Sequence, residues 1–331
     1  MNEFRPIPFL GNPHVQTLLG TVLPEPQIAW PTTEWIVPLP DGDHVIIYDN
    51  RPYGWVNGTP IVVILHGLGG SHQSNYCVRT AKQLLPHGYR VVRMDMRGGG
   101  RGIYFARRIY NAGLTSDIHF LLDQFLRESP KSPVVLVGFS LGGNVAAKTV
   151  GEMSHKPHPN VTALVAANAP IDLAACSALL GKRENKFYDD YFGKVLLSHV
   201  TRHQKLFPDL PPVRFPKQLS LKAFDDVYTA PRGGYANAED YYQRSSAFPL
   251  IEHIPVPTLL VTARDDPFID VHAYEALSPR PTLNVRITEK GGHLGFLGFN
   301  GKWGYRWLEP QIVEWIRTTV PPTHYSSLQN G

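Results

Sequence analysis

The chain lacks any long hydrophobic run and any visible targeting signal. Its longest apolar runs, such as residues 61–65 and 134–137, are far shorter than the roughly 20 residues that cross a bilayer. The first twenty residues do not place a basic segment before an apolar one, so we expect no signal peptide. These features predict a soluble, cytoplasmic protein with no integral membrane segment.

Cysteines and runs of one charge are also scarce. Cys77 and Cys176 are the only cysteines, which excludes a disulfide framework and the paired spacing of a structural metal site. We therefore expect a reducing compartment and no metal. The net charge is only +4, and no cluster of Lys and Arg is long enough to indicate a nucleic-acid partner.

The residues that are present describe a folded protein. Hydrophobic residues make up 43% of the chain and charged residues 18%, which argues against disorder. Short apolar runs without alternation are typical of strands buried on both faces of a parallel sheet. Several of these runs are separated by helix-like stretches, which predicts an α/β fold with a mostly parallel, doubly wound sheet. The runs are residues 61–65, 90–94, 134–137, 161–166, 258–262 and 285–288.

Capping residues and prolines locate three helices. Ser116 is expected to cap a helix with one apolar face, which ends before Pro130. Residues 141–152 should form a helix directly after a strand, and Pro310 should be the first residue of a helix near the end of the chain.

The domain organisation follows from where this alternation is interrupted. Residues 1–30 are rich in proline and aromatic residues and predict an extended arm, followed by a hairpin around the Asp-Gly turn at 41–42. Residues 172–246 contain many aromatic residues and a proline-rich centre. We expect them to form a mostly helical cap with an apolar pocket, inserted between core segments 1–171 and 247–331.

Ser140 is the predicted nucleophile. The sequence GFSLG at residues 138–142 lies between an expected strand and an expected helix, which is the context of a nucleophile elbow. Such a turn brings strand and helix close together, so small residues are needed two positions before and after the serine. Its hydroxyl then lies at the positive end of the helix, where negative charge that develops on a substrate is stabilised.

An activated serine needs a base and an acid that orients the base. Asp265 and Asp266 follow the strand at 258–262, and His293 follows the last expected strand, which gives the order Ser, acid, His of this kind of site. Both groups lie beyond carboxyl ends of strands, where the sites of open parallel sheets gather. We predict His293 as the base and Asp266 as the acid, with Asp265 as the alternative acid. If Asp266 is the acid, we expect Asp265 to bond loop amides.

Backbone amides complete the predicted site. Leu141 follows the nucleophile, and Leu68 lies in the loop HGLGG at residues 66–70, so their N–H groups are the expected oxyanion hole. His66 is expected to brace this loop. The glycines are followed by neither a G-K-[ST] sequence nor the dinucleotide fingerprint, so we expect no cofactor.

Motifs along nearly the whole chain resemble the YheT-like branch of the α/β-hydrolases, which includes the related eukaryotic ABHD1, ABHD2 and ABHD3 group. The motif near the start and the Asp-Tyr-Tyr segment are unusual outside this branch and so carry more weight than the elbow. The motifs are residues 13–17 (PHVQT), 66–71 (HGLGGS), 96–99 (MRGG), 138–144 (GFSLGGN), 224–226 (FDD), 240–242 (DYY), 265–268 (DDPF) and 291–296 (GGHLGF).

The resemblance implies an esterase or lipase-like enzyme that acts on short-chain carboxylic esters or monoacylglycerols without metal or cofactor. Its triad falls on Ser140, Asp266 and His293. The same triad would also serve a thioesterase, a lactonase or an amidase, and a non-catalytic ligand-binding protein of the same fold is a further alternative. The acyl chain length, the oligomeric state and the mobility of the cap stay open.

Overall fold

A computed structural model describes residues 3–23, 28–299 and 305–322. These residues form an eight-stranded sheet in the order β1-β2-β4-β3-β5-β6-β7-β8. Strands β1 and β2 form the antiparallel hairpin, β2 pairs antiparallel with β4, and all other neighbours are parallel. The strands are β1 (Thr33–Pro38), β2 (His44–Asn50), β3 (Ile61–Leu65), β4 (Arg90–Asp95), β5 (Val134–Phe139), β6 (Val161–Ala167), β7 (Thr258–Ala263) and β8 (Leu283–Thr288).

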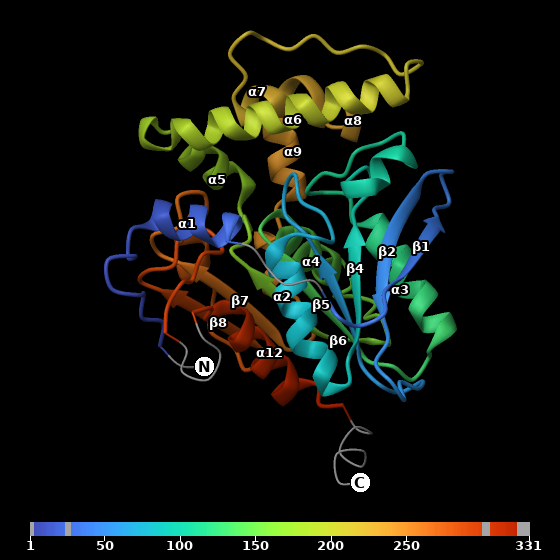
Figure 1. Cartoon of the computed structure of the whole chain (residues 1–331). Coiled ribbons are helices and arrows are strands. Elements are labelled where there is room, and N and C mark those ends of the chain that lie inside the picture. The colour runs from blue at the N-terminus through green and yellow to red at the C-terminus, as the bar shows by residue number, and fades with distance from the viewer. Residues whose placement is uncertain (1–2, 24–27, 300–304, 323–331) are drawn as a thin grey trace.

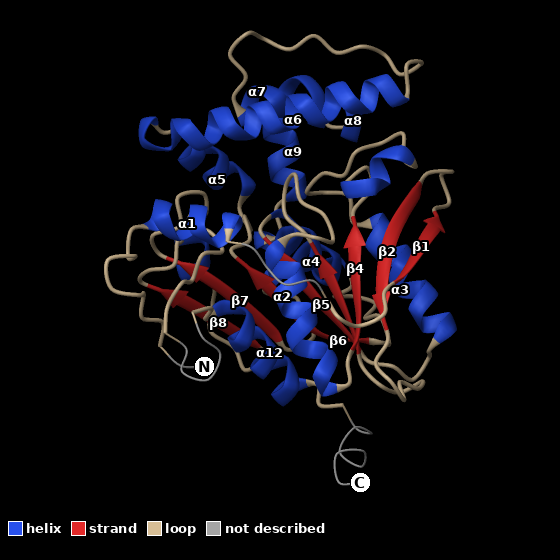
Figure 2. Ribbon diagram, in the orientation of Figure 1, coloured by secondary structure: helices blue, strands red, loops and turns tan. Residues whose placement is uncertain are grey.

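Helices cover both faces of the sheet (Figure 2). In the central strand β3, Val62 and Ile64 belong to one hydrophobic cluster, whereas Val63 and Leu65 belong to another. The first cluster includes side chains of α2 and α12, and the second those of α3 and α4, so the sheet is doubly wound as predicted. These helices are α2 (Asn75–Leu84), α3 (Ser116–Glu128), α4 (Leu141–Glu152) and α12 (Leu308–Thr319), with short turns η1 (Leu85–His87), η2 (Gly100–Tyr104), α10 (Phe248–Ile251) and α11 (His272–Glu275).

Two helix starts differ from the sequence-based expectation. Helix α3 begins at Ser116, and Thr115 is the N-cap but donates its hydroxyl to Glu152 and makes no capping bond. Helix α12 begins at Leu308, so Pro310 is its third residue. Proline is tolerated anywhere in a first turn, because those N–H groups have no partner within the helix, and its position therefore does not fix the start.

The arm is helical where the sequence predicted an extended segment. Helix α1 (Pro13–Val22) has Pro13 at its first position, and the Asn12 side chain accepts hydrogen bonds from the N–H groups of His14 and Val15 at 2.9 and 3.2 Å. These are the standard start signals of a helix. Residues 1–2 and 24–27 of the predicted arm, and 300–304 and 323–331 of the predicted core, lie outside the described residues.

The residues predicted as a cap are mostly helical and lie above the sheet, on the side to which the β4 arrow points (Figure 1). Within the described ranges, no helix combines the length and the apolarity needed to cross a bilayer. The helices above the sheet are α5 (Leu173–Leu180), η3 (Arg183–Asn185), α6 (Lys186–Leu206), α7 (Leu221–Phe224), the π-helical η4 (Asp225–Thr229), α8 (Ala230–Gly233) and α9 (Ala238–Ser245).

A buried arginine ties the loop after β4 to two other parts of the fold. The Arg97 guanidinium, on a residue only 2% exposed, donates to both carboxylate oxygens of Asp117 at 2.9 and 2.7 Å. It also donates to Asp43 at 2.9 Å and to Asp41 at 2.6 Å, both in the hairpin turn. Arg97 therefore joins the β1–β2 hairpin and the start of α3 to the edge of the sheet.

Removal of this guanidinium should destabilise the protein strongly. Arg97→Leu leaves the buried carboxylates of Asp43 and Asp117 unpaired, and we expect a loss of about 3–5 kcal/mol in the free energy of unfolding, measured in urea. The control is Arg5→Leu. Arg5 is exposed and, among the residues that the structure describes, pairs only with exposed Glu3, so a loss below about 1 kcal/mol is expected. Equal losses in the two variants would contradict this account.

Candidate active site

Ser140 occupies a strained turn between β5 and α4. Its backbone has φ 49° and ψ −126°, a conformation that costs energy in a residue with a side chain and is found mainly at functional sites. Strand and helix approach so closely that a Cβ on Gly138 would lie 2.2 Å from the carbonyl oxygen of Gly142. The glycine two positions before the serine is therefore a steric requirement of the turn.

His293 lies between Ser140 and Asp266. Its Nδ1 is 2.8 Å from Oδ2 of Asp266, and its Nε2 is 2.9 Å from the Ser140 hydroxyl oxygen. Because an ionised carboxylate can only accept, Nδ1 donates the hydrogen bond, and Nε2 is left with a lone pair directed at the serine hydroxyl. The three predicted residues are thus brought together in the geometry of a nucleophile, a base and an acid that orients the base.

Asp266 is held in place by several donors. Asp266 is 4% exposed, and its Oδ1 accepts hydrogen bonds from the backbone N–H groups of Phe268 and Ile269 at 2.8 and 3.3 Å. Oδ2 also accepts the side-chain amide of Asn168 at 2.7 Å. Asn168, which follows β6, was not singled out from the sequence. These donors fix the orientation of the carboxylate that faces His293.

Asp265 points to a different partner. Its Oδ1 accepts the backbone N–H of Gly292 at 2.9 Å, one residue before His293. Burial raises the pKa of this carboxyl above its ordinary value. Asp265 therefore contacts the backbone of the histidine loop, whereas Asp266 contacts the imidazole.

The two predicted oxyanion amides border the same cavity as Ser140. Leu141 is the first residue of α4, so its N–H has no partner within the helix and lies at the positive end of the helix dipole. Leu68 lies in the loop after β3, and both leucines line the cavity at Ser140. Both residues of the predicted oxyanion hole therefore border the space next to Ser140.

Tyrosine and histidine side chains hold the loop that contains Leu68. The N–H of Gly67 donates to the Tyr76 hydroxyl at 2.9 Å, and the N–H of Gly69 donates to the Tyr110 hydroxyl at 2.7 Å. His66 is fully buried, its Nδ1 lies 2.7 Å from the Gly67 carbonyl oxygen, and its Nε2 accepts a backbone N–H after β4. Burial lowers the pKa of His66, so the neutral imidazole braces the loop.

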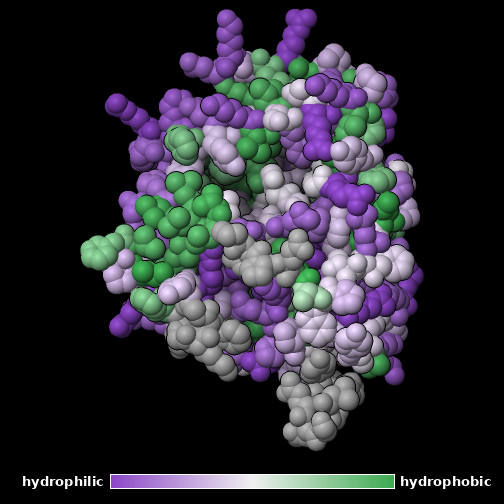
Figure 3. Space-filling model, in the orientation of Figure 1, coloured by the Kyte–Doolittle hydropathy of each residue, from purple (hydrophilic) through white to green (hydrophobic). Residues whose placement is uncertain are grey.

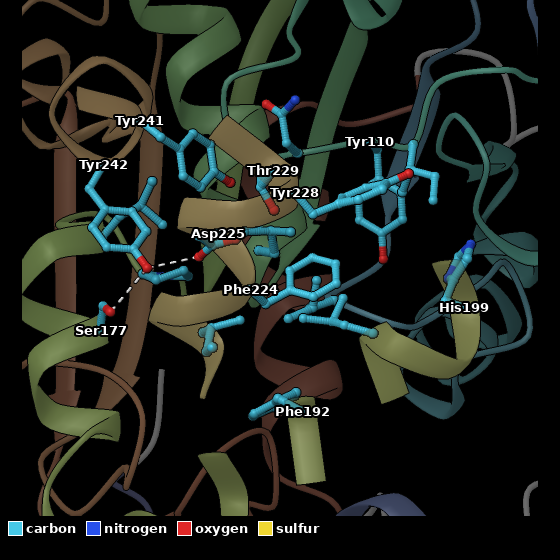
Figure 4. A pocket seen from close by; sticks show the side chains of 18 of the residues that line it. Tyr110, Ser177, Phe192, His199, Phe224, Asp225, Tyr228, Thr229, Tyr241 and Tyr242 are labelled. Atoms are coloured by element: carbon cyan, nitrogen blue, oxygen red, sulfur yellow. Dashed lines mark hydrogen bonds between the residues drawn. The ribbon is translucent and has the colours of Figure 1, made fainter. Parts of the chain in front are cut away.

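A cavity of about 410 Å³ extends from Ser140 toward the helices above the sheet. Its wall is mainly apolar, with a few polar side chains among the aromatic rings (Figure 4). The apolar side chains include Leu68, Leu173, Leu180, Phe192, Leu196, Phe224 and Phe268. Among the described residues, no group of three His, Cys, Asp or Glu side chains is arranged to hold a metal ion.

Helix α1 braces the His293 loop. The Thr17 hydroxyl accepts the backbone N–H of His293 at 2.9 Å and donates to the Pro13 carbonyl at 2.8 Å. Gln16 exchanges two hydrogen bonds with the backbone of Leu297, at 2.6 and 3.1 Å. The polar inner face of α1 thus hydrogen-bonds the backbone of this loop.

The contact is also sterically close. A Cβ on Gly292, beside His293, would lie 2.4 Å from the Pro13 carbonyl oxygen. His14, one turn before Thr17 in α1, lies with its Nδ1 2.9 Å from the Tyr188 hydroxyl of α6. Residues 13–17 stood out in the sequence only through the resemblance, because no local pattern shows what a helix start will contact.

Loss of the Thr17 hydroxyl should weaken activation of Ser140. Thr17→Val leaves the His293 N–H without its acceptor, and we expect Ser140 to react about tenfold more slowly with a fluorophosphonate probe, since a lost buried hydrogen bond costs about 1–3 kcal/mol. Thr17→Ser keeps the hydroxyl and should react at nearly the wild-type rate. A wild-type rate in Thr17→Val, with its fold retained, would remove Thr17 from this role.

Comparison with known proteins identifies the family of the chain. Residues 60–299 match the family described as "alpha/beta hydrolase fold". The chain is 33% identical over 322 residues to the Escherichia coli protein named "Putative esterase YheT", covering 96% of this chain and 93% of that protein. It is 25% identical to a Saccharomyces cerevisiae monoacylglycerol lipase, covering 78% of this chain and 59% of the lipase.

Solved structures agree on the fold. The Pyrococcus furiosus esterase Pf2001 superposes with a TM-score of 0.59 at 18% identity, and the match covers 96% of this chain and 98% of that one. At such low sequence identity, the match is evidence for the fold alone. The family match and the YheT similarity, which together span nearly the whole chain, confirm the resemblance seen in the motifs. The chain belongs to the α/β-hydrolase family, in its YheT-like branch, and is an enzyme of the hydrolase class.

Proposed function

We propose that the chain hydrolyses carboxylic esters by acyl transfer through Ser140, with His293 as the base and Asp266 as the orienting acid. The observation that supports this best is the continuous hydrogen-bonded line from the Ser140 hydroxyl through the imidazole to the Asp266 carboxylate, at 2.9 and 2.8 Å. The esterase and lipase names of the relatives point to the same chemistry.

The reaction proceeds in two steps. His293 takes the proton of the Ser140 hydroxyl as its oxygen attacks the ester carbonyl, and the resulting oxyanion is stabilised by the N–H groups of Leu68 and Leu141. Asp266 stabilises the imidazolium that forms. The imidazolium protonates the leaving alcohol, and a water molecule activated by His293 then releases the acid and regenerates Ser140.

The proposed substrates are short-chain carboxylic esters or monoacylglycerols, with the acyl chain in the apolar cavity. In this proposal residues 172–246 are a cap on a core of residues 1–171 and 247–331, because the cavity at Ser140 is walled largely by side chains of α5 to α9.

We also propose a reducing, cytoplasmic location, which the two buried free thiols Cys77 and Cys176 support.

Substitution of Ser140 tests the proposal directly. Ser140→Ala should lower kcat for 4-nitrophenyl butyrate by about a thousandfold or more, because the nucleophile is lost while the oxyanion donors remain. The wild-type protein should be labelled by a fluorophosphonate probe on the peptide that contains Ser140. An unlabelled Ser140 and no ester turnover would instead favour a ligand-binding protein of the same fold.

The adjacent aspartates provide a matched pair of variants. Asp266→Asn should reduce kcat by about a thousandfold or more, because an amide cannot stabilise the imidazolium and favours the wrong tautomer. Asp265→Asn keeps an oxygen that accepts the Gly292 N–H and should cost less than tenfold. The reverse order of effects would transfer the acid role to Asp265.

The cavity predicts a dependence on acyl length. In a series of 4-nitrophenyl esters from acetate to dodecanoate, kcat/KM should rise by up to about fourfold for each methylene buried, the equivalent of about 0.8 kcal/mol. The rise should end where the cavity is filled. Maximal kcat/KM at acetate would show that the acyl chain does not enter this cavity.

A further inference from the structure

Asp225 is a buried carboxyl group in the wall of the cavity that also contains Ser140. The residue is 7% exposed and begins η4, a π-helical turn between α7 and α8. Such turns are rare and are frequently found at functional sites. Figure 4 shows the Asp225 side chain among the aromatic side chains of Phe224, Tyr228 and Tyr242.

The partners of Asp225 are hydroxyl groups. Tyr242 of α9 donates to Oδ2 at 2.8 Å and itself accepts from the Ser177 hydroxyl at 3.1 Å (Figure 4). The Thr229 hydroxyl also hydrogen-bonds the carboxylate. The nearby ammonium of Lys222 is 54% exposed and pairs with Asp226 and Glu239. Within the described part of the chain, the carboxylate therefore has no ion-pair partner.

An ionised carboxylate in an apolar cavity is costly to the fold. Burial raises the pKa of Asp225 to about 6 from its ordinary 3.8, so stability falls as the pH rises toward 6 and stays lower above it. At neutral pH the group is an anion with spare acceptor capacity. The titratable and hydroxyl groups that face it are Thr229 and Asp226 on its own element, Tyr241 and Tyr242 on α9, and Lys222 on α7.

Charge around the cavity selects among possible ligands. Three arginines, Arg107, Arg108 and Arg232, line the same cavity and disfavour a cationic ligand. The Asp225 carboxylate disfavours an anionic one. A neutral group that donates a hydrogen bond satisfies both conditions, and an apolar pocket with one such acceptor is the usual way to fix a ligand's orientation.

We propose that Asp225 is a specificity-determining acceptor that binds a hydroxyl group of the ester substrate, so that the enzyme prefers hydroxyl-bearing esters to their purely apolar isosteres. This inference rests on the proposed function. The hydroxyl can belong to the alcohol part of the ester, as in a partial ester of a polyol, or to the acyl part, as in a hydroxy acid.

Two pairs of isosteric substrates distinguish these sources. One pair is 2-hydroxyethyl butyrate and propyl butyrate, which differ on the alcohol side. The other is 4-nitrophenyl 3-hydroxybutanoate and 4-nitrophenyl 3-methylbutanoate, which differ on the acyl side. The measured quantity is the ratio of kcat/KM within each pair, in which any general effect on the triad cancels.

We expect the wild-type protein at pH 7.5 to prefer the hydroxyl substrate of one pair by about tenfold, as a hydrogen bond to a charged acceptor allows. Asp225→Asn should bring that ratio close to one. This variant keeps an oxygen that accepts from Tyr242, so it preserves the link between η4 and α9 while removing the charge. The control is Asp226→Asn, which alters a carboxylate that accepts the Ala238 N–H and should leave the ratio as in wild type.

Wild-type ratios near one in both pairs, or a ratio that survives in Asp225→Asn, would overturn the proposal. Should Asp225→Asn fail to fold, Tyr242→Phe decides, because it keeps the carboxylate and should keep the preference; a ratio that collapses to one in this variant would assign recognition to the phenol. Failure of the proposed function has a different signature, namely no turnover of any ester and no labelling of Ser140.

The melting temperature separates recognition from a structural link. Because ionised Asp225 costs stability, Asp225→Asn should raise Tm relative to wild type at pH 8, and by less at pH 5, where the wild-type carboxyl is mostly protonated. If the carboxylate instead stabilised the fold, Asp225→Asn would lower Tm. A lower Tm at both pH values together with unchanged ratios would mark Asp225 as a structural residue.

Discussion

The hydrogen-bonded line through Ser140, His293 and Asp266 depends on three loops that follow different strands and must agree to within about 0.5 Å. Strands β5, β7 and β8 are parallel, so their carboxyl ends meet at one edge of the sheet and bring the loops near one another. The loops are positioned more accurately by side chains that hydrogen-bond the backbone of the histidine loop and the carboxylate of Asp266. Thr17 holds the histidine loop from outside, and Asn168 holds the acid.

This division explains how much was predictable from the sequence. Strands buried on both faces are continuous apolar runs, so the fold class and the strand positions were predicted and are confirmed by the structure and the family match. Ser140 and His293 could be predicted as partners because local residues mark each turn, and the structure brings their side chains within hydrogen-bonding distance. Thr17 and Asn168 were missed because their partners lie 276 and 98 residues away, and no local pattern reports such contacts.

The helical state of α1 was missed for a different reason. The Asn12–Pro13 start signal was present, but its inner face is polar or small, with Gln16, Thr17 and Gly20 buried. The proline and aromatic content of residues 1–30 predicted an extended arm, and this helix does not show the apolar face that usually indicates one. The face is polar because it binds the backbone of the histidine loop, which needs hydrogen bonds more than apolar contact.

The buried charged groups of Arg97 and Asp225 have opposite effects on stability. Arg97 is surrounded by carboxylates, so the loss of its hydration is offset by hydrogen bonds and it ties structural elements together. Within the described ranges Asp225 has only hydroxyl partners, so its charge costs stability at neutral pH. The strained backbone of Ser140 also costs stability. Both costly features line the same cavity, where a fold under selection for stability alone would have removed them.

The same charge distribution bears on the course of the proposed reaction. A carboxylic ester is neutral, whereas the acid released from it is an anion at neutral pH. A carboxylate at position 225 attracts a hydroxyl of the substrate but repels the product carboxylate through a medium of low dielectric constant. Arg107 and Arg108 of the cavity wall are half exposed, and they already pair with Asp209 and Asp41. The proposed binding of a substrate hydroxyl by Asp225 thus gives a functional reason for a group that weakens the fold to lie in the wall of the cavity.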